Sequence, residues 1–481
     1  MITEKDFNIS LLCDFYEFTM GNGYLRAGME DFTACFDLYF RKVPDNGGFA
    51  IAAGLPTLIQ YIEQLHFSDE DIEFLRSKNI FCEEFLQYLR NFKFECDVYA
   101  VPEGTPIFPE EPIVTVKGPA IQAQLLETML LLTINHQSLI ATKANRIVRA
   151  AQGRPVYEFG TRRAQGNNAA VLGARAAYIG GCAGTACSIC EQLYNIPAVG
   201  TMAHSWIQMF NTEYEAFEAY AKYYPDNCIL LIDTYNVLKS GIPNAIKTYE
   251  NVLKPLGKRL KGIRIDSGDV TYLSRKVRKI LDEAGLTDCT IFLSNSLDEY
   301  LIRDIISQGA QADFFGVGER LITSKSEPVF GGVYKLVAAG RDKLEPKIKI
   351  SETYEKITTP GFKKVYRLFS NETQNMVADL IALHDEQFDF TKPITLFDPI
   401  NTWKQKTFTD YSVKELLVPI FEKGKLVYTC PDIEYTKKYC AEQIGNIWEE
   451  VLRFENPQNY YVDLSQKLWN TKQSMLHTRA L

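Results

Sequence analysis

The segment Gly262-Ile263-Arg264-Ile265-Asp266-Ser267-Gly268-Asp269 holds the pattern that decides the fold. A short apolar run stops there in a polar cluster, which is typical of a buried strand that ends at the edge of a sheet. Comparable apolar runs recur at intervals of roughly 20 to 40 residues and mostly alternate with helical stretches. Such alternation predicts parallel strands joined by right-handed crossovers. The other runs cover residues 155–159, 196–199, 228–232, 290–293 and 313–317.

Polar clusters follow five of these predicted strands. They occupy residues 158–163, 200–205, 233–236, 264–269 and 316–320. The number of β/α units fits a doubly wound sheet or an incomplete α/β barrel, and in both folds ligands bind at the carboxyl ends of the strands. Five polar clusters at such ends therefore predict an active site. The helices between the strands are expected, for example, over residues 168–194 and 273–284.

The rest of the chain has a different character. Residues 11–20 predict a helix that stops at Gly21-Asn22-Gly23, and residues 119–151 predict a long helical stretch. Residues 345–385 are expected to be rich in strands, and the chain from residue 413 is expected to be mostly helical.

The composition excludes some classes of function. The chain of 481 residues has 46% hydrophobic and 23% charged residues, as in ordinary globular proteins of about two or three domains. Its net charge of −8 argues against a general nucleic-acid-binding protein and against a membrane-surface protein. An anionic substrate would need local positive charge, for which Arg162, Arg163 and Arg264 are the candidates.

The sequence favours a cytoplasmic protein. The first residues have neither the basic nor the apolar region of a secretory signal, and the most apolar stretch, residues 120–139, is interrupted by Glu127, Asn135 and His136. That stretch is expected to be a buried helix rather than a membrane span. Eleven scattered cysteines suit a reducing compartment, and the Cys187-x-x-Cys190 pair is interpreted as structural because no second pair follows at zinc-site spacing.

Arg264 and Asp266 lie two residues apart on a predicted strand, so their side chains point to the same side. The guanidinium can bind a carboxylate or phosphate with two hydrogen bonds. The carboxylate can accept hydrogen bonds from a sugar diol or hold Mg²⁺ through water. The alternative is a structural ion pair.

His204 and Asp233 follow successive predicted strands. An aspartate bonded to the Nδ1–H of a histidine fixes the tautomer and leaves Nε2 as a base or nucleophile, so we expect Asp233 to orient His204. The alternative for His204 is a core histidine. Neither a serine-hydrolase elbow nor an H-E-x-x-H zinc motif is found in the sequence.

Gly316-Val317-Gly318 follows another strand and could present backbone N–H groups to an anion. Leu321 stands where a dinucleotide-binding motif would need a third glycine, so a dinucleotide is disfavoured. A purely structural turn is the alternative. Taken together, the clusters favour a phosphosugar or nucleotide substrate.

At these residues the chain resembles the nicotinate phosphoribosyltransferase family. The matching pieces occur in family order across most of the chain, and together they are specific. They are residues 12–16 (LCDFY), 158–166 (EFGTRRAQG), 200–205 (GTMAHS), 233–235 (DTY), 264–269 (RIDSGD), 316–318 (GVG) and 331–336 (GGVYKL).

The resemblance implies a reaction and a fold. Nicotinate and phosphoribosyl pyrophosphate would give nicotinate mononucleotide and pyrophosphate, coupled to ATP hydrolysis with Mg²⁺, in NAD salvage. The implied fold is α/β, an irregular and incomplete α/β barrel with a second α/β sandwich domain. That second domain would be built from the N-terminal part and from segments after the barrel.

The resemblance also implies domain boundaries and an assembly. The N-terminal sandwich domain would cover residues 1–120 and the catalytic barrel residues 121–338. A segment over residues 339–481, first rich in strands and then helical, would pack on both. The family is typically a homodimer with shared active sites, and no metal ligands are expected from the protein.

Roles follow by resemblance for the residues around the base and the histidine. His204 would be phosphorylated by ATP and Asp233 would orient it. Phe159 would cover one face of nicotinate, and Tyr16 of the neighbouring subunit would cover the other.

The remaining roles concern the anionic groups. Arg162, Arg264 and Thr201 would meet the nicotinate carboxylate or substrate phosphates, and Asp266 would hold the ribose hydroxyls. Gly316 and Gly318 would bind the 5′-phosphate. Glu319 departs from the threonine that many members carry, which puts a side-chain phosphate contact there in doubt but not the backbone one.

Three rival readings remain open at this point. Nicotinamide phosphoribosyltransferase shares the barrel and the histidine, but an arginine facing the carboxylate should make the amide a poor substrate. Quinolinate phosphoribosyltransferase has a related fold without the ATP step and would be expected to have more basic residues. A catalytically silent nucleotide-binding protein would bind phosphoribosyl pyrophosphate and release no pyrophosphate.

Overall fold

A computed structural model describes residues 8–479 of the chain, which is mixed α/β with one parallel sheet and several antiparallel sheets. The chain forms two compact units. One comprises Ile140–Pro328, and the other combines the segments before and after it. Helix α6 (Glu127–Ala150) runs across the first boundary between them.

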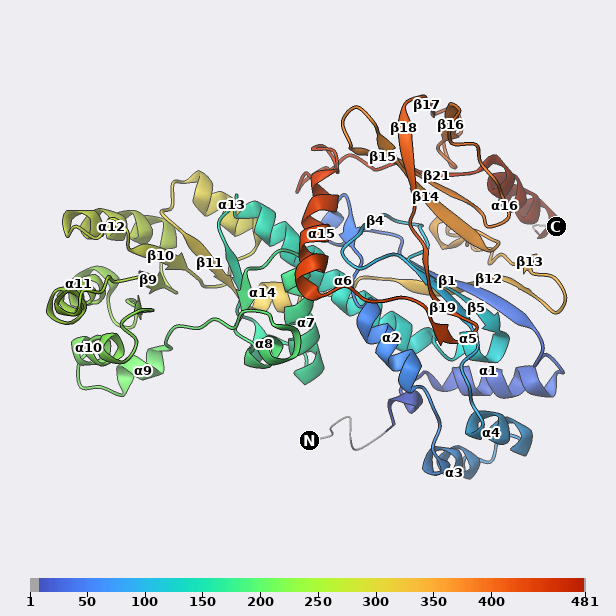
Figure 1. Cartoon of the computed structure of the whole chain (residues 1–481), viewed down its shortest axis with the longest axis horizontal. Coiled ribbons are helices and arrows are strands. Elements are labelled where there is room, and N and C mark those ends of the chain that lie inside the picture. Colours follow the sequence, from blue (N-terminus) through green and yellow to red (C-terminus); the bar gives the residue numbers. More distant parts are fainter. Residues whose placement is uncertain (1–7, 480–481) are drawn as a thin grey trace. The chain divides into compact units, whose positions relative to one another are not determined.

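The unit formed by Ile140–Pro328 contains a six-stranded parallel sheet with the order β7-β6-β11-β10-β9-β8. Its strands are β6 (Val156–Glu158), β7 (Gly184–Thr185), β8 (Ile229–Leu231), β9 (Gly262–Ile265), β10 (Thr290–Leu293) and β11 (Phe314–Val317). The helices of this unit, in the green and yellow part of Figure 1, are α7 (Asn167–Ile179), α8 (Ser188–Tyr194), α9 (His204–Gln208), α10 (Glu213–Tyr223), α11 (Ile242–Thr248), α12 (Val270–Glu283), α13 (Glu299–Ser307) and α14 (Glu319–Ile322).

The strands of this sheet are apolar because helices bury them. Leu230, Ile263, Ile291 and Phe315 are each 0% exposed. The polar residues that follow the strands also start the next helices. Asp269 accepts a hydrogen bond from the backbone of Tyr272 in α12, as expected of a helix N-cap. The predicted β/α alternation is therefore confirmed for this part of the chain.

Two details of the prediction for this unit are wrong. Residues 168–194 do not form one helix, since α7 ends before Gly180-Gly181 and the short strand β7 intervenes before α8. Gly181 has φ +114, a left-handed conformation that ends α7. Residues 196–199 form only a single bridge, between Ala198 and Thr185 of the two-residue strand β7.

The other unit is built on antiparallel sheets. A seven-stranded sheet has the order β13-β12-β1-β5-β3-β19-β20 and a four-stranded sheet the order β18-β14-β15-β21, and β16-β17 and β2-β4 form two small pairs. The strands are β1 (Thr33–Tyr39), β2 (Ala50–Ile51), β3 (Asp97–Ala100), β4 (Pro106–Ile107), β5 (Val114–Pro119), β12 (Val333–Gly340), β13 (Glu345–Pro346), β14 (Lys363–Ser370), β15 (Met376–Leu383), β16 (Ile394–Phe397), β17 (Gln405–Phe408), β18 (Tyr411–Glu415), β19 (Val418–Glu422), β20 (Lys425–Leu426) and β21 (Val462–Leu464).

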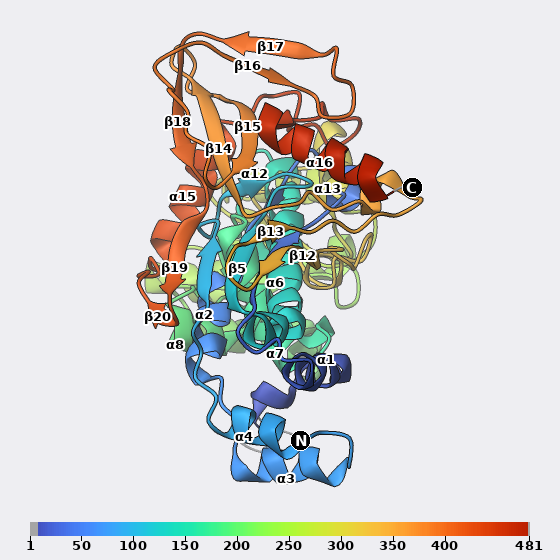
Figure 2. The same ribbon diagram turned by 90° about the vertical axis from the view of Figure 1, so that its right-hand side faces the viewer.

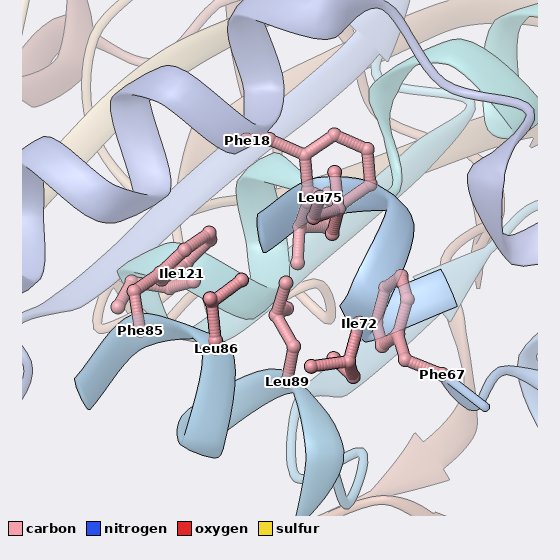
Figure 3. Close-up of a cluster of buried hydrophobic side chains, with 9 residues drawn as sticks. Phe18, Phe67, Ile72, Leu75, Phe85, Leu86, Leu89 and Ile121 are labelled. Carbon is pink, nitrogen blue, oxygen red and sulfur yellow. The ribbon is translucent and has the colours of Figure 1, made fainter. Parts of the chain in front are cut away.

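Helices complete this unit (Figure 2). They are α1 (Phe15–Arg26), α2 (Leu55–Gln64), α3 (Asp69–Ser77), α4 (Glu83–Arg90), α5 (Ala120–Gln124), α15 (Ile433–Gly445) and α16 (Gln466–Arg479). Apolar side chains from α1, α3, α4 and α5 form one buried cluster, shown in Figure 3, to which Phe18, Leu75, Phe85 and Ile121 belong. This packing explains why these short helices are stable.

Helix α1 does not stop at Gly21-Asn22-Gly23 as expected but continues to Arg26. A side chain at Gly21 would lie 3.0 Å from the Phe85 ring, so this glycine lets α1 approach α4 closely rather than ending the helix. The chain after residue 413 is also less helical than expected, because β19 and β20 add to the seven-stranded sheet before α15 begins. No helix within residues 8–479 combines the length and the apolar character needed to cross a membrane.

Candidate active site

Polar side chains gather at the carboxyl ends of the parallel strands. Strands β9, β10, β11 and β6 are consecutive neighbours in the sheet, and β8 pairs with the other side of β9. The carboxyl ends of parallel strands lie at one edge of a sheet, so residues distant in sequence meet there. His204, Asp233, Arg264 and Asp266 belong to one connected set of contacts at this edge.

Arg264 is held on several sides by neighbouring polar groups. Its Nη2 donates to Asp266 Oδ1 at 2.9 Å, and its Nη1 lies 3.4 Å from Thr201 Oγ1. Its Nε donates to Ser294 Oγ at 2.9 Å. The side chain of Arg264 is only 14% exposed, so the orientation of the guanidinium is well defined. The sequence indicated the Arg264–Asp266 neighbourhood but gave no sign of Ser294.

His204 is the first residue of α9 and is 40% exposed. Its Nδ1 lies 3.1 Å from the hydroxyl of Thr234, and its Nε2 lies 3.9 Å from Asp266 Oδ2. The ring therefore has one nitrogen bonded to the protein and the other on the side of the Asp266 carboxylate. That arrangement leaves Nε2 accessible for chemistry.

The predicted hydrogen bond between Asp233 and His204 is wrong. Asp233 Oδ2 instead accepts from the backbone N–H of Asp266, at 3.1 Å, and from the hydroxyl of Ser267, at 2.5 Å. Thr234 follows Asp233 directly, in the bend after β8, and its hydroxyl rather than the Asp233 carboxylate lies next to His204. Asp233 thus holds the turn after β9, and Thr234 contacts the histidine.

Phe159 follows β6 and lies next to the arginine. Its ring centroid is 5.5 Å from that of Phe292, and the Arg264 guanidinium carbon is 5.7 Å from its centroid. Arg162 lies in the short helical turn Thr161–Arg163 and is exposed. The structure thus joins Phe159 to the Arg264 cluster and leaves the Arg162 side chain in solvent.

Gly316 and Gly318 pack against Phe159. A Cβ at Gly316 would lie 2.9 Å from the Phe159 ring, and a Cβ at Gly318 would lie 3.1 Å from the Phe159 carbonyl oxygen. Glycine at these positions lets β11 approach β6 closely. Glu319 then begins α14 and pairs with Lys325 at 2.6 Å, and the hydrogen bond from Lys325 lowers the pKa of the Glu319 carboxyl. Arg163 lies 4.0 Å away, so positive side chains offset the charge of Glu319.

Glu158 supports the turn that carries Phe159 but was not among the predicted site residues. Its buried carboxylate accepts hydrogen bonds from the backbone of Gly160 and from the hydroxyl of Thr185, at 2.6 Å for the latter. Burial raises the pKa of this carboxyl above its ordinary value, and the two hydrogen bonds oppose that rise. A buried acid at the end of a strand was the signal that could have identified it.

Tyr16 belongs to the other unit. It lies on α1 and is 42% exposed, next to Phe15, which is 47% exposed. Two neighbouring aromatic rings on one exposed turn of helix are available to a partner.

The described residues contain no group of three or more His, Cys, Asp or Glu side chains that could hold a metal ion by themselves. Asp233 Oδ1 is one of several buried carboxylate oxygens that have no hydrogen-bond partner within residues 8–479. Mg²⁺ is commonly bound by one or two carboxylates together with substrate phosphates. Asp233 and the adjacent Asp266 fit that pattern.

Family models match three parts of the chain. The nicotinate phosphoribosyltransferase N-terminal domain matches residues 11–135, the nicotinate phosphoribosyltransferase family matches residues 155–339, and the C-terminal domain matches residues 362–472. The central match covers the strands whose carboxyl ends carry the candidate site.

Known proteins resemble the chain over nearly its whole length. It is 44% identical to the nicotinate phosphoribosyltransferase of Bacillus subtilis, with 98% of this chain and 96% of the relative covered. It is 37% identical to such an enzyme of Mycobacterium tuberculosis, over 95% and 92%. The crystal structure of human nicotinic acid phosphoribosyltransferase superimposes with a TM-score of 0.86 at 29% identity, over 96% and 99%. The chain therefore belongs to the nicotinate phosphoribosyltransferase family.

Proposed function

We propose that this enzyme makes nicotinate mononucleotide and pyrophosphate from nicotinate and phosphoribosyl pyrophosphate, a step of NAD salvage, and that it couples this reaction to ATP hydrolysis. The observation that carries the proposal is the contact set of His204, Arg264 and Asp266 at the carboxyl ends of parallel strands. It combines a nucleophile, a cation and a carboxylate. Those are the groups that a phosphorylated sugar, an anionic base and a phosphoryl donor require.

Arg264 would bind the nicotinate carboxylate or a substrate phosphate, with Thr201 beside it and the exposed Arg162 adding charge. The guanidinium retains donor hydrogens beyond those used by Asp266 and Ser294. Phe159 would cover one face of the pyridine ring. Because Arg264 favours an anionic base, this geometry supports nicotinate over nicotinamide.

The carboxylate and the glycines would hold the sugar phosphate. Asp266 would accept hydrogen bonds from the ribose hydroxyls through Oδ2, since Oδ1 already binds Arg264 and Ser294. Gly316 and Gly318 would place the backbone close to the 5′-phosphate, and Glu319, already paired with Lys325, would not contact it. Fixed donors around the phosphates stabilise the charge that develops as pyrophosphate leaves the ribose.

His204 would be the group that ATP phosphorylates. Nε2 would attack the terminal phosphorus, forming an N–P bond while the bond to the ADP oxygen breaks. Thr234 at Nδ1 would keep the ring oriented. Water would later cleave the N–P bond and release phosphate.

Mg²⁺ bound to the pyrophosphate would neutralise the leaving group. Asp233, through its unpartnered Oδ1, and Asp266 would hold it together with the substrate. The ion would therefore arrive with phosphoribosyl pyrophosphate.

We further propose a homodimer in which Tyr16 of one subunit covers the nicotinate that Phe159 of the other contacts. The exposed rings of Tyr16 and Phe15 support this. We also propose domain boundaries at residues 120 and 338 and an incomplete α/β barrel that contains the parallel sheet. The compact unit Ile140–Pro328 lies inside the proposed catalytic segment. The free cysteines support a cytoplasmic enzyme.

The first test measures pyrophosphate release from phosphoribosyl pyrophosphate with nicotinate or nicotinamide, with and without Mg·ATP. We expect wild type to prefer nicotinate and to be accelerated by ATP. His204→Ala should lose the acceleration and keep the slower ATP-independent reaction. A preference for nicotinamide would support the amide-specific enzyme instead, and no pyrophosphate with either base would support a silent binder.

The dimer is tested by mixing Tyr16→Ala and His204→Ala, two variants expected to lose ATP-stimulated activity, after joint unfolding and refolding. If each active site contains Tyr16 of one subunit and His204 of the other, mixed dimers should regain ATP-stimulated activity, because one of their two sites then contains both wild-type residues. Mixtures no more active than their components would overturn the sharing of sites between subunits.

A further inference from the structure

Ser294 is the residue at which strand β10 ends. Its backbone N–H donates to the Ile265 carbonyl at 3.0 Å, which continues the pairing of β10 with β9. Ser294 is 3% exposed. The hydroxyl is thus fixed by the sheet beside the residues that follow β9.

The Ser294 hydroxyl closes a ring of hydrogen bonds. It accepts from Arg264 Nε at 2.9 Å and donates to Asp266 Oδ1. The same Oδ1 accepts from Arg264 Nη2 at 2.9 Å. Arg264 and Asp266 alone would form a single contact about which the guanidinium could turn, whereas the hydroxyl adds a second fixed point on Nε.

The ring determines which donors remain for a ligand. Nε and one hydrogen of Nη2 are used within the protein, and in the described part of the chain Nη1 has only the 3.4 Å contact with Thr201. A planar guanidinium held at both Nε and Nη2 keeps its plane and its direction. A ligand carboxylate would then meet the Nη1 end without having to reorient the side chain.

The loop after Ser294 is also held in an unusual conformation. Asn295 and Ser296 have φ values of 104 and 46, a region that side chains other than glycine rarely adopt. Such a backbone persists only where surrounding contacts fix it. Ser294 fixes its beginning, and Asp298, which caps α13 and pairs with Arg320, fixes its end.

We propose that Ser294 is a positioning residue that orients Arg264 for the nicotinate carboxylate and so contributes to the choice of nicotinate over nicotinamide. The proposal rests on the proposed function of the site. Ser294 does not itself contact substrate in this scheme and acts through the orientation of Arg264 and Asp266.

The test compares Ser294→Ala, Ser294→Thr and Ser274→Ala. Threonine retains a hydroxyl. Ser274 is a matched control in α12, since it is 0% exposed and its hydroxyl also both donates, to the Thr271 carbonyl at 3.1 Å, and accepts, from the Gln311 backbone at 3.1 Å. KM and kcat are measured for nicotinate and for nicotinamide, and folding is monitored by circular dichroism and the thermal midpoint.

We expect Ser294→Ala to raise KM for nicotinate about tenfold, the effect of one lost hydrogen bond to a charged group. Nicotinamide should change little, so the ratio of kcat/KM for the two bases should fall about tenfold, while kcat changes much less than KM. This ratio does not depend on the fraction of folded enzyme. Ser294→Thr should recover most of the preference, and Ser274→Ala should keep the wild-type ratio.

An unchanged ratio in Ser294→Ala, or an equal fall in Ser274→Ala, would overturn the role of Ser294. Failure of wild type to form pyrophosphate with nicotinate would instead overturn the proposed function. The two failures are therefore distinguishable.

Discussion

The chain contains two arginine–aspartate pairs that look alike in isolation and behave differently in their surroundings. Arg264 and Asp266 lie two residues apart at the end of β9, and their side chains are 14% and 32% exposed. Arg367 and Asp379 face each other across β14 and β15 and are both 0% exposed. The first pair lies in the candidate active site, and the second lies in the other unit.

The buried pair is saturated with partners. Arg367 Nε and Nη2 both bind Asp379, and Nη1 donates to the Pro106 carbonyl at 2.9 Å. Tyr460 donates to Asp379 Oδ1 at 2.9 Å. These contacts join three segments that are distant in sequence, so the pair has a structural role.

The exposed pair keeps unused capacity. Among residues 8–479, Asp266 Oδ2 has no partner closer than His204 at 3.9 Å, and Arg264 Nη1 has one long contact. A charged side chain whose donors or acceptors are all hydrogen-bonded within the protein stabilises a conformation. A charged side chain that keeps donors or acceptors at the edge of a sheet can bind a ligand. The exposed fraction of the side chains and the use of their hydrogen-bond donors and acceptors, rather than residue type, distinguish the structural pair from the pair in the candidate site.

Loss of the aspartate should destabilise the protein most where the pair is buried. We expect Asp379→Asn to lower the free energy of unfolding by about 3 to 5 kcal/mol, because the buried charge of Arg367 would lose the carboxylate that binds its Nε and Nη2. Asp385→Asn, which breaks an exposed pair with Lys467, should change it by about 1 kcal/mol or less. Urea unfolding of both variants measures the difference. Equal losses would show that burial does not distinguish these pairs.

Replacement of the active-site arginine should reduce activity rather than stability. Arg264→Lys keeps the charge but cannot contact Asp266, Ser294 and Thr201 together, so kcat/KM for nicotinate should fall about 10- to 100-fold. The unfolding midpoint should remain close to that of wild type. Arg275→Lys, at an exposed position of α12, should leave kcat/KM unchanged. A comparable fall in the control would contradict a specific role of Arg264.

We also expect the stability of the protein to depend on pH through Glu111, whose carboxyl interacts with the buried pair. Burial, followed by the charge of Asp379, raises the pKa of this carboxyl well above its ordinary value, although Arg367 opposes the rise. A carboxyl whose pKa is raised on folding contributes full stability below its unfolded pKa of about 4.3 and loses it as the pH rises through the folded pKa.

Glu111→Gln removes this titration. The stability of wild type relative to the variant should therefore fall, by up to about 1.4 kcal/mol per pH unit, from about pH 4.3 upward until the folded pKa is passed. Urea midpoints at a series of pH values measure it. A constant difference between the two proteins would refute the assignment.

The smallest expected effect concerns the partner of His204. Thr234→Val removes the hydroxyl at Nδ1 with little change of shape, so ATP stimulation should fall about fivefold, as for one neutral hydrogen bond. Thr234→Ser should retain the stimulation. Pyrophosphate release with and without Mg·ATP measures both variants, and full stimulation in Thr234→Val would remove the threonine from the site.

The sequence predicted the parallel sheet and the edge at which the candidate site lies, because short apolar runs that end in polar residues and alternate with helices are typical of buried parallel strands. It predicted the nearness of Arg264 and Asp266 as well, since a strand has a period of two residues. It failed at Gly21 of α1, where packing against Phe85 overrides the local tendency to end a helix. It also missed β7, whose two residues are too few to give a pattern.

The sequence by itself thus determined the alternation of strands and helices in most of the central unit, the residues at the strand ends and the family. Only the tertiary structure decided that Thr234 rather than Asp233 contacts His204, that Ser294 joins Arg264 to Asp266, and that Arg367 faces Asp379. Local patterns depend on neighbours within a few residues. These contacts join residues 12 to 30 positions apart, and strand register and crossover geometry bring them together.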